Sequence, residues 1–427
     1  MSGRGAPRLS RVVANSVIGA TSDLVSVVVV TYETPEEMLH ECLRSVRDSD
    51  YRSTQVVVID NSVTDRVAKF LANWRAQQEP TDPALLVERL SKNVGYAAAT
   101  NRGIAASSGD LVLLLNPDAT LGRSALARLV NAAQLRPHAI GFAPKIRLAS
   151  QPLVIDSVGL DLHLRGQASQ RGLGEPDIGQ YDIPERVAGL CFAAALIRRS
   201  AFSPGVVGLL DERYFMFYED VDWSMRASMR GRQFWSVPSA EVLHVHSAST
   251  RQMRSQFKAR LIQRNWMWTA AKNLERRRVG RVLVGLTIRN LLRGVVDGHL
   301  LSSVRVTGEA WLGLPALANQ RRDVQRTRTR SDRKVLSEPS KVKSFNADAY
   351  EPTPSVSTLV STLSRLYAVA PDPVLGRLVV QLNLADQTSM ALDPGRMAAI
   401  VRQSGVAIAP GLEWLLTCLE RDDQGAY

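Results

Sequence analysis

The chain has 427 residues, 45% of them hydrophobic and 22% charged, which is typical of a globular protein and excludes a disordered one. At this length two or three structural units are expected. The net charge of +12 is spread unevenly, with 26 basic and 26 acidic residues in 1–250, 18 and 4 in 251–330, and 9 and 11 in 331–427. The basicity therefore belongs to one segment, and a basic nucleic-acid-binding fold is not indicated for the rest.

The first 22 residues and the cysteines bear on location. Residues 1–22 contain VVANSVIGA, a poor signal-peptide core because Asn and Ser interrupt it. No apolar run approaches the roughly 20 residues that span a bilayer. Cys42, Cys191 and Cys418 are too widely separated to indicate a disulfide framework or a zinc site, so a reducing compartment is the simpler interpretation. We expect a cytoplasmic protein, with the inner face of the plasma membrane as a peripheral site.

From Val25 onward, apolar runs alternate with helical periods. Strands are predicted for VSVVVVTY, QVVVID, LLVERL and LVLLL, and helices for Pro35 to Arg47, for the stretch ending near Gln78, for AAATNRGIAASS and for SALARLVNAAQL. Strands that alternate with helices of about ten residues indicate βαβ units and a Rossmann-like, largely parallel sheet. After Phe142 the pattern becomes mixed, and VAGLCFAAALIRRSAF predicts a buried strand that enters a helix.

These patterns divide the chain into five segments. We expect a flexible N-terminus (1–22), a catalytic α/β domain (23–250) and a basic helical segment (251–320). A linker rich in Arg, Ser, Lys and Pro (321–354) and a helical C-terminal region without assigned chemistry (355–427) would follow.

The basic segment combines arginines with apolar residues. On a helix, Arg281, Arg289 and Arg293 share one i+4 row, beside an apolar stripe formed by Val284, Ile288, Leu292 and Val295. This pattern suits a helix that lies on an anionic membrane surface. A helix packed on the main domain with a solvated basic face explains it equally well.

Three acids follow apolar runs: Asp60 after VVVI, Asp118 after LVLLLNP, and Asp220 after YFMFYE. Because proline has no N–H to donate, the LVLLL strand must end by Asn116, which leaves Asp118 on the loop beyond it. An acid there is a turn former or a ligand, and open α/β sheets bind ligands at these strand ends. Asp60 could accept a hydrogen bond from a base or ribose, Asp118 could hold a divalent metal on a diphosphate, and Asp220 could act as a base.

Five motifs in order carry a family resemblance: VVVVTY, VVVIDNSVTD, NVGYAAATNRGIAASSGDLVLLLNPDATL, YFMFYEDVDWSMR and PSAEVLHVHSAST. Together they resemble the family 2 glycosyltransferases of the A-type fold, in particular the bacterial rhamnosyltransferase-like branch. The resemblance covers residues 24–275. The Gln-x-x-Arg-Trp motif of processive synthases is absent, and Glu33 stands where the family commonly has Asn or Asp.

The resemblance implies roles for individual residues. Those expected at the donor nucleotide are Thr31, Tyr32, Asp60, Asn93, Gly95, Asn101 and Asn116. The metal, Mg²⁺ or Mn²⁺, is expected on Asp118, with His244 as a further contact and His246 as its substitute. The Glu-Asp pair of the family matches Glu219 and Asp220, with Asp220 as the base. Helix capping is the alternative role for this acidic turn.

The resemblance predicts an inverting, metal-dependent glycosyltransferase of cell-envelope polysaccharide synthesis. Its partners would be a nucleotide-diphosphate sugar, favoured as dTDP-rhamnose, and a glycan or polyprenyl-diphosphate-linked acceptor, without nucleic acid. One alternative is a galactofuranosyltransferase that uses UDP-galactofuranose. The other is a non-catalytic sugar- or nucleic-acid-binding protein on the same scaffold.

Overall fold

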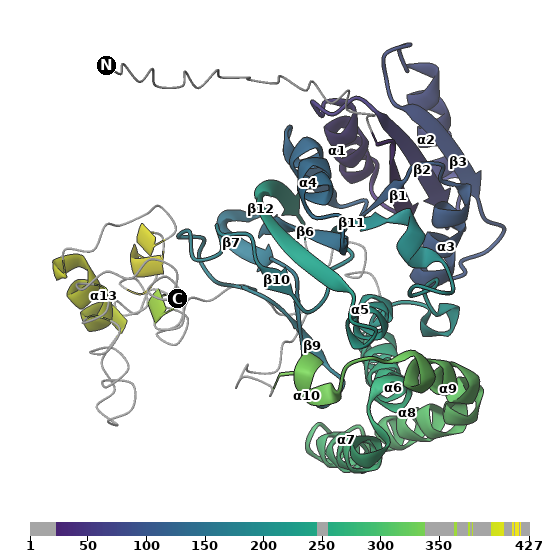
Figure 1. Cartoon of the computed structure of the whole chain (residues 1–427), viewed down its shortest axis with the longest axis vertical. Helices are drawn as coiled ribbons and strands as arrows, with labels where there is room; N and C mark the ends of the chain where they lie inside the picture. The colour runs from purple at the N-terminus through teal and green to yellow at the C-terminus, as the bar shows by residue number, and fades with distance from the viewer. Residues whose placement is uncertain are drawn as a thin grey trace, which may run out of the picture.

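A computed structural model describes residues 23–245 and 255–337, together with short segments between 363 and 419. The N-terminal 22 residues, His246 and most of the segment from 338 onward lie outside the described residues. The described part is an α/β sheet followed by a group of helices (Figure 1).

The central feature is a ten-stranded mixed sheet in which eight strands follow the order β10-β12-β6-β11-β4-β1-β2-β3. Two more strands pair at its side, β5 with β12 and β7 with β6. The strands are β1 (Val25–Thr31), β2 (Thr54–Asp60), β3 (Ala84–Arg89), β4 (Leu111–Leu115), β5 (Ala119–Leu121), β6 (Ala139–Leu148), β7 (Gln151–Ser157), β10 (Arg186–Val187), β11 (Ala194–Arg198) and β12 (Gln233–His244).

Strands β1 to β4 pair in parallel, as the alternation of apolar runs and helical periods predicts. Strands β1 and β4 are buried along their whole length, which explains why their sequences are nearly continuous runs of Val and Leu. Strand β11 is antiparallel to both β4 and β6, and β12 is parallel to β6. Strand β12 therefore runs in the direction of β1, β2 and β4.

Helices cover both faces of the sheet. One face carries alternate β1 residues such as Val27 and Val29 and packs against α1 (Glu36–Arg47), α2 (Arg66–Ala76) and α4 (Ala125–Leu135). The other face carries Val28 and packs against α3 (Tyr96–Ala106) and α5 (Glu219–Met229). A separate hairpin, β8 (Leu160–Leu162) and β9 (Ala168–Gln170), extends toward the helical part.

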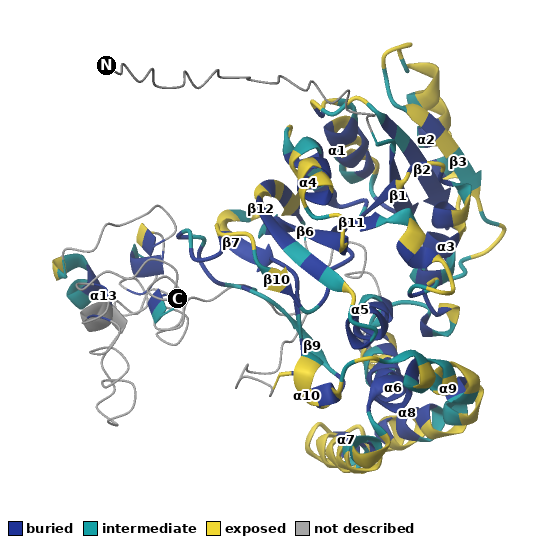
Figure 2. Cartoon of the chain, in the orientation of Figure 1, coloured by how far each residue is buried: buried dark blue, intermediate teal, exposed yellow. Residues whose placement is uncertain are grey.

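The helical part consists of α6 (Ser255–Asn273), α7 (Arg276–Val296), α8 (Leu300–Gly313), the short turn η4 (Leu314–Leu317), α9 (Ala318–Thr327) and α10 (Asp332–Val335). Trp266, Met267 and Ala270 of α6 belong to the same buried cluster as the inner residues of β1 and β4. Figure 2 shows α6 buried and α7 exposed along much of its length. Among the helices that the structure describes, none is both long and apolar enough to cross a bilayer.

Two details differ from the expected segments. Residues 321–327 continue helix α9, where we expected a linker, and Asp332 of α10 is fully buried between Arg278 and Arg328. These ion pairs bind the Arg-rich stretch to the helical group, an effect that composition does not reveal. After β11 the chain forms only the short 3-10 turn η1 (Arg199–Phe202) instead of a longer helix.

Candidate active site

The predicted functional residues share one edge of the sheet. Because β1, β2, β4 and β12 run in the same direction, their carboxyl ends meet at this edge. Thr31, Asp60, Asn116 and His244 lie at the ends of these four strands, as the order of motifs indicates.

Asp118 and His244 are brought into direct contact by the short strand β5. After Asp118 the chain pairs with β12, so that Ala119 lies opposite His244. Nε2 of His244 is 3.3 Å from Oδ1 of Asp118, and Nδ1 is 2.7 Å from Oδ2 of Asp156 on β7. All three side chains are buried. A carboxylate on each side of one imidazole fixes its orientation.

The protonation states of His244 and Asp118 depend on each other. Burial opposes the charged form of His244, but Asp118 and Asp156 outweigh it and raise the pKa of the imidazole to about 10. Burial likewise favours a neutral Asp118, yet His244 keeps the pKa of that carboxyl below its ordinary value. In the metal-free protein the group is therefore an ionised carboxylate beside an imidazolium.

Asp118 fits a divalent cation that is shared with a substrate, and His244 would join it after losing the proton on Nε2, because metal ligands must be deprotonated. Oδ1 of Asp118 is buried and accepts no hydrogen bond from the described residues. Within the described part of the chain, no three His, Cys, Asp or Glu side chains form a closed metal cage. A cation held by one or two side chains takes its remaining ligands from phosphates and water, which is the usual arrangement for Mg²⁺.

Glu219 and Asp220 begin helix α5 behind an aromatic loop. Phe215, Phe217 and Tyr218 in this loop have φ values of 65°, 65° and 71°, the left-handed region that bulky side chains rarely adopt. The amide of Asn265 on α6 holds the loop, since it donates to the carbonyl oxygens of Tyr214, Met216 and Phe217 at 3.0, 2.9 and 2.8 Å. Strained backbone directly before an acidic pair is characteristic of functional sites.

The environment of the acidic pair favours the protonated forms. Burial raises the pKa of Asp220 to about 6, although hydrogen bonds from the backbone, including Val221 N–H at 2.7 Å, work against the rise. Burial, followed by the charge of Asp220, raises the pKa of Glu219 well above its ordinary value. Oε2 of Glu219 has no hydrogen-bond partner among the described residues. A carboxylate with a pKa near neutral is suited to accept and release a proton.

The loop before α3 is organised by two asparagines. Oδ1 of Asn93 accepts hydrogen bonds from the Asn61 side chain and from Gly95 N–H, both at 2.9 Å, and Asn61 in turn accepts from Val94 N–H. Gly95 has a φ of +85°, and a Cβ there would lie 2.5 Å from Phe215. The expected donor loop is thus packed directly against the aromatic loop of the acidic pair.

Three other residues that we expect at the donor nucleotide differ in how far they are buried. Thr31 is buried and donates its hydroxyl to Thr34, whereas Tyr32 is exposed. Asp60 is fully buried, with Oδ1 accepting from Ser62 N–H at 3.0 Å and Oδ2 3.8 Å from Nε of Arg89. Oδ2 accepts no hydrogen bond from the described residues, so it is available to a ligand donor.

Glu33, the departure from the family pattern, has a structural role here. Its carboxylate accepts from the backbone N–H groups of Val63 and Thr64 at 3.0 and 2.9 Å and from the Thr64 hydroxyl. Glu33 thereby closes the loop after β2.

Asn101 and Asn116 also differ from each other. Both ends of the Asn101 amide bind the segment before the aromatic loop, through Leu210 N–H and C=O and the Glu212 carboxylate. Asn101 therefore supports this segment from helix α3. Asn116 lies directly after β4, and its carbonyl oxygen accepts from Ala119 N–H and from the Cys42 thiol.

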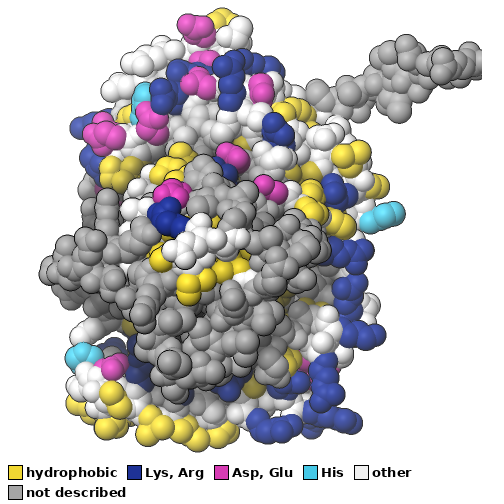
Figure 3. Space-filling view, turned by 90° about the vertical axis from the view of Figure 1, so that its left-hand side faces the viewer, with side chains coloured by type: hydrophobic (Ala, Val, Ile, Leu, Met, Phe, Trp, Pro, Cys, Tyr) yellow, Lys and Arg dark blue, Asp and Glu magenta, His cyan; other side chains and the backbone are white. Residues whose placement is uncertain are grey.

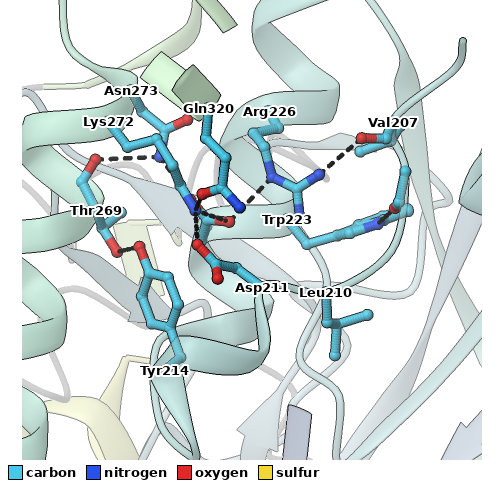
Figure 4. Close-up of polar contacts among 12 residues, drawn as sticks. Val207, Leu210, Asp211, Tyr214, Trp223, Arg226, Thr269, Lys272, Asn273 and Gln320 are labelled. Atoms are coloured by element: carbon cyan, nitrogen blue, oxygen red, sulfur yellow. Dashed lines mark hydrogen bonds and ion pairs between the residues drawn. The ribbon is translucent and has the colours of Figure 1, made fainter. Parts of the chain in front are cut away.

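Asp222, the third acid of the turn, belongs to a buried ionic network. Figure 4 shows its other members Asp211, Arg226 and Lys272. The Asp222 carboxylate contacts Nε of Arg226 and Nζ of Lys272, both at 2.9 Å, and Lys272 also pairs with Asp211 at 2.8 Å. Only 1% of the Lys272 side chain is exposed. The network fastens α5 to α6, so the three acids divide into a site pair and a structural anchor.

The residues that we did not predict for the site are Asp156, Asn61 and Asn265. Asp156 follows the apolar stretch Leu153 to Ile155, the same signal that identified the other acids. Asn265 lies in QRNW and carries no local signal, because its role depends on the packing of α6 against a distant loop.

Comparisons with known proteins agree with this geometry. The family model described as "Glycosyl transferase family 2" matches residues 26–204. An N-acetylglucosaminyl-diphospho-decaprenol L-rhamnosyltransferase of Mycobacterium tuberculosis is 34% identical over 251 residues, which cover 54% of this chain and 78% of that protein. An N-acetylglucosaminyltransferase of Bradyrhizobium elkanii is 31% identical over 122 residues, covering 27% and 63% of the two chains.

Among solved structures, GalNAc-T7 with UDP, GalNAc and Mn²⁺ is similar with a TM-score of 0.48 and 16% identity, covering 59% of this chain and 48% of that one. The sequence match over most of the mycobacterial enzyme, together with the mostly parallel sheet, decides the classification. The chain belongs to the family 2 glycosyltransferases, in their rhamnosyltransferase-like branch with the A-type fold, and is a glycosyltransferase.

Proposed function

We propose that this glycosyltransferase is inverting and metal-dependent, and that it moves one sugar from a nucleotide-diphosphate donor to a lipid-linked glycan. The observation that carries the proposal is the buried Asp118 carboxylate at the carboxyl edge of the sheet, whose Oδ1 lies 3.3 Å from Nε2 of His244. A buried carboxylate needs a positive partner, which the imidazolium supplies here and which a bound cation would supply in its place.

In the proposed reaction the acceptor hydroxyl oxygen forms a bond to the anomeric carbon of the donor sugar. The bond from that carbon to the diphosphate oxygen breaks, and its electron pair leaves with the nucleoside diphosphate. The Asp220 carboxylate takes the hydroxyl proton, a contribution of roughly 10²- to 10⁴-fold. Attack opposite the leaving group inverts the anomeric centre, so no enzyme nucleophile is needed.

Asp118 and His244 would hold Mg²⁺ or Mn²⁺ on the donor diphosphate, where the cation supplies charge stabilisation for the leaving oxygens. Asp156 would orient His244 through the 2.7 Å contact with Nδ1. Asp60 and the Asn93–Gly95 loop would contact the nucleoside, with Thr31, Tyr32 and Asn116 beside them.

The favoured donor is dTDP-rhamnose, and the favoured acceptor is a glycan on a polyprenyl diphosphate. Both are supported by the name of the mycobacterial relative and by the rhamnosyltransferase-like motifs. UDP-galactofuranose is the alternative donor. We place the enzyme in the cytoplasm, peripheral on the inner face of the plasma membrane, in cell-envelope polysaccharide synthesis.

Calorimetric titration with dTDP and with UDP, each with Mn²⁺ and with a chelator, tests the donor site. We expect one nucleotide to bind in the presence of Mn²⁺ and to bind at least tenfold more weakly with the chelator. Asp118→Asn should abolish the metal effect because a neutral amide is a poor ligand for a hard cation. Absence of nucleotide binding in every condition would contradict the proposal and favour a non-catalytic binding protein.

A panel of nucleotide sugars offered with a lipid-linked N-acetylglucosaminyl diphosphate identifies the donor. Transfer from dTDP-rhamnose supports the favoured reaction. Transfer from UDP-galactofuranose alone would retain the mechanism and replace the sugar.

A further inference from the structure

Helix α7 is apolar on two opposite sides. One side, with Leu283, Leu286 and Gly294, is buried in the helical group. On the opposite side, four aliphatic residues each expose more than half of their surface: Val284, Ile288, Leu292 and Val295. A soluble helix normally places polar residues there, so the second apolar side is unexplained by packing.

Helix α8 extends this exposed surface. Leu301 and Leu312 are 87% and 85% exposed, and Leu300 and Val304 are also exposed. The indole N–H of Trp311 donates to the Thr287 hydroxyl at 3.0 Å, which places the outer side of α8 beside the exposed stripe of α7. We call these exposed residues of α7 and α8 the outer face.

The two helices present the outer face rigidly. Gly294 of α7 contacts Ser303 of α8 so closely that a Cβ there would lie 2.4 Å from the Ser303 hydroxyl oxygen. The connection between the helices is a short turn at Asp297–His299, with Gly298 at φ +70°. The pair therefore has little freedom to rotate its apolar residues inward.

Arginines surround the apolar residues. Arg276, Arg277, Arg281, Arg293 and Arg305 are exposed on the same two helices. The acids of these helices are Asp297, paired with Arg293 at 3.2 Å, and Glu309, which is held by Arg260 and Arg264. Figure 3 shows hydrophobic side chains along the lower edge of the molecule, with Lys and Arg side chains next to them.

We propose that the outer face of α7 and α8 docks on an anionic lipid bilayer, with its aliphatic residues among the acyl chains and its arginines at the phosphates. Aliphatic residues flanked by arginines are the pattern of interfacial helices. A second copy of the chain fits poorly, because two faces with the same positive charge would repel each other. The long arginine side chains can reach the head groups while their stems lie against apolar neighbours.

Arg289 links helix α7 to the segment before the acidic pair. The Arg289 guanidinium of α7 stacks over the ring of Trp266 at 4.5 Å, and the Trp266 indole N–H donates to the carbonyl oxygen of Arg165 at 2.8 Å. Arg289 also acts electrostatically on Tyr218, the residue before Glu219. This step rests on the proposed function: Arg165 and Arg289 would meet the diphosphate of a lipid-linked acceptor between the bilayer and the acidic pair.

Vesicle flotation tests the docking without catalysis. The full chain should float with phosphatidylglycerol-containing vesicles at low salt and remain unbound with pure phosphatidylcholine vesicles. Ile288→Glu with Leu301→Glu should lower binding at least tenfold, because charged groups replace inserted aliphatic ones. Arg277→Gln with Arg281→Gln should lower binding about fivefold for each arginine removed.

Leu135→Glu with Ile183→Glu is the matched control, since it makes the same exchanges at exposed positions on other elements. This control should float like the original chain, and circular dichroism should show the same melting behaviour for all variants. Failure of the original chain to float, or equal flotation of the outer-face variant, would overturn the proposal. A dimer that dissociates in the outer-face variant, detected by sedimentation without vesicle binding, would assign the outer face to self-association. None of these outcomes depends on the sugar donor, so the proposed function can fail or hold separately.

Discussion

At the residue scale, the acidic pair shows how burial prepares a carboxylate for proton transfer. Asp220 follows three residues with positive φ and lies beside Glu219, whose pKa is also raised by burial. Because the two carboxyls interact, their protons are lost as a coupled system. Both carboxyls hold their protons more tightly than exposed acids would, with the pKa of Asp220 at about 6.

Replacement of Asp220 separates catalysis from donor binding. Asp220→Asn should lower the turnover number by roughly 10²-fold or more, because the amide cannot take the acceptor proton. The affinity for the nucleotide, measured by calorimetry with Mn²⁺, should remain within about threefold. Near-normal turnover in this variant would remove Asp220 from the mechanism.

The pH dependence of the reaction follows from the same carboxyl. The base must be ionised, so kcat/KM should fall as the pH drops through about 6, the pKa of Asp220 in the folded protein. We expect a single ionisation on the acidic limb of a pH–rate profile in the range 5–8. A limb near pH 4 would show that an ordinary exposed carboxyl is responsible.

The free energy of unfolding should change with pH in the opposite direction from the activity. The folded state holds the Asp220 proton more tightly than the unfolded state, so the original chain loses stability as the pH rises from about 4 to about 6. Asp220→Asn avoids this loss and should be more stable by about 1–3 kcal/mol at pH 7.5, a difference that shrinks toward pH 4.5. Urea unfolding at the two pH values measures the difference. Equal stability of the two proteins at pH 7.5 would argue against a raised pKa.

At the element scale, α5 is the helix that connects the site to the helical part. Its first two residues face the site, whereas Asp222 and Arg226 join the buried ionic network with Lys272 of α6. Asn265, also on α6, holds the aromatic loop before α5. The position of the acidic pair is therefore determined by a helix about 40 residues further along the chain.

Removal of the central cation of this network should be costly. Lys272→Met leaves Asp211 with Arg213, and Asp222 with Arg226 and the Asn273 amide, and should lower the free energy of unfolding by about 3 kcal/mol, as is typical when one partner of a buried pair is lost. Arg293→Met is the control, because its exposed pair with Asp297 should contribute no more than about 1 kcal/mol. Chemical denaturation measures both. An effect of Lys272→Met as small as that of the control would mean that the network adds nothing to stability.

At the scale of the whole molecule, the sheet and helix α6 share one buried cluster. Trp266, Met267, Ala270 and Leu274 follow Asn265 and belong to the same cluster as the core of the sheet. The domain boundary at residue 250 stays a prediction; the charge changes there, since acidic and basic residues balance in 1–250 and basic residues dominate 251–330.

Truncated fragments test whether the sheet needs the helical part in order to fold. A fragment of residues 1–250 should fail to fold, because it exposes the apolar surfaces that α6 covers. A fragment of residues 1–337 should be soluble and unfold in one cooperative transition. Thermal unfolding followed by circular dichroism distinguishes the two fragments. A stable, cooperatively folded 1–250 fragment would support the separate catalytic domain.

The sequence by itself determined the strands and helices of the first 135 residues except the short strand β5, because buried parallel strands require continuous apolar runs and their helices require a 3.6-residue period. It also placed Asp60, Asp118 and Asp220 after strand-like runs, and the order of motifs identified the family. The pairing of Asp118 with His244 was expected from family resemblance, and β5 explains how it arises.

Only the tertiary structure decided the contacts between distant segments. The orientation of His244 depends on Asp156, 88 residues away, and the aromatic loop depends on Asn265, some 50 residues further along the chain. Local patterns report which residues avoid water, but they do not report which buried surfaces meet. For the same reason the apolar stripe of α7 was compatible with burial or with a membrane, and only the folded chain shows that the stripe is exposed.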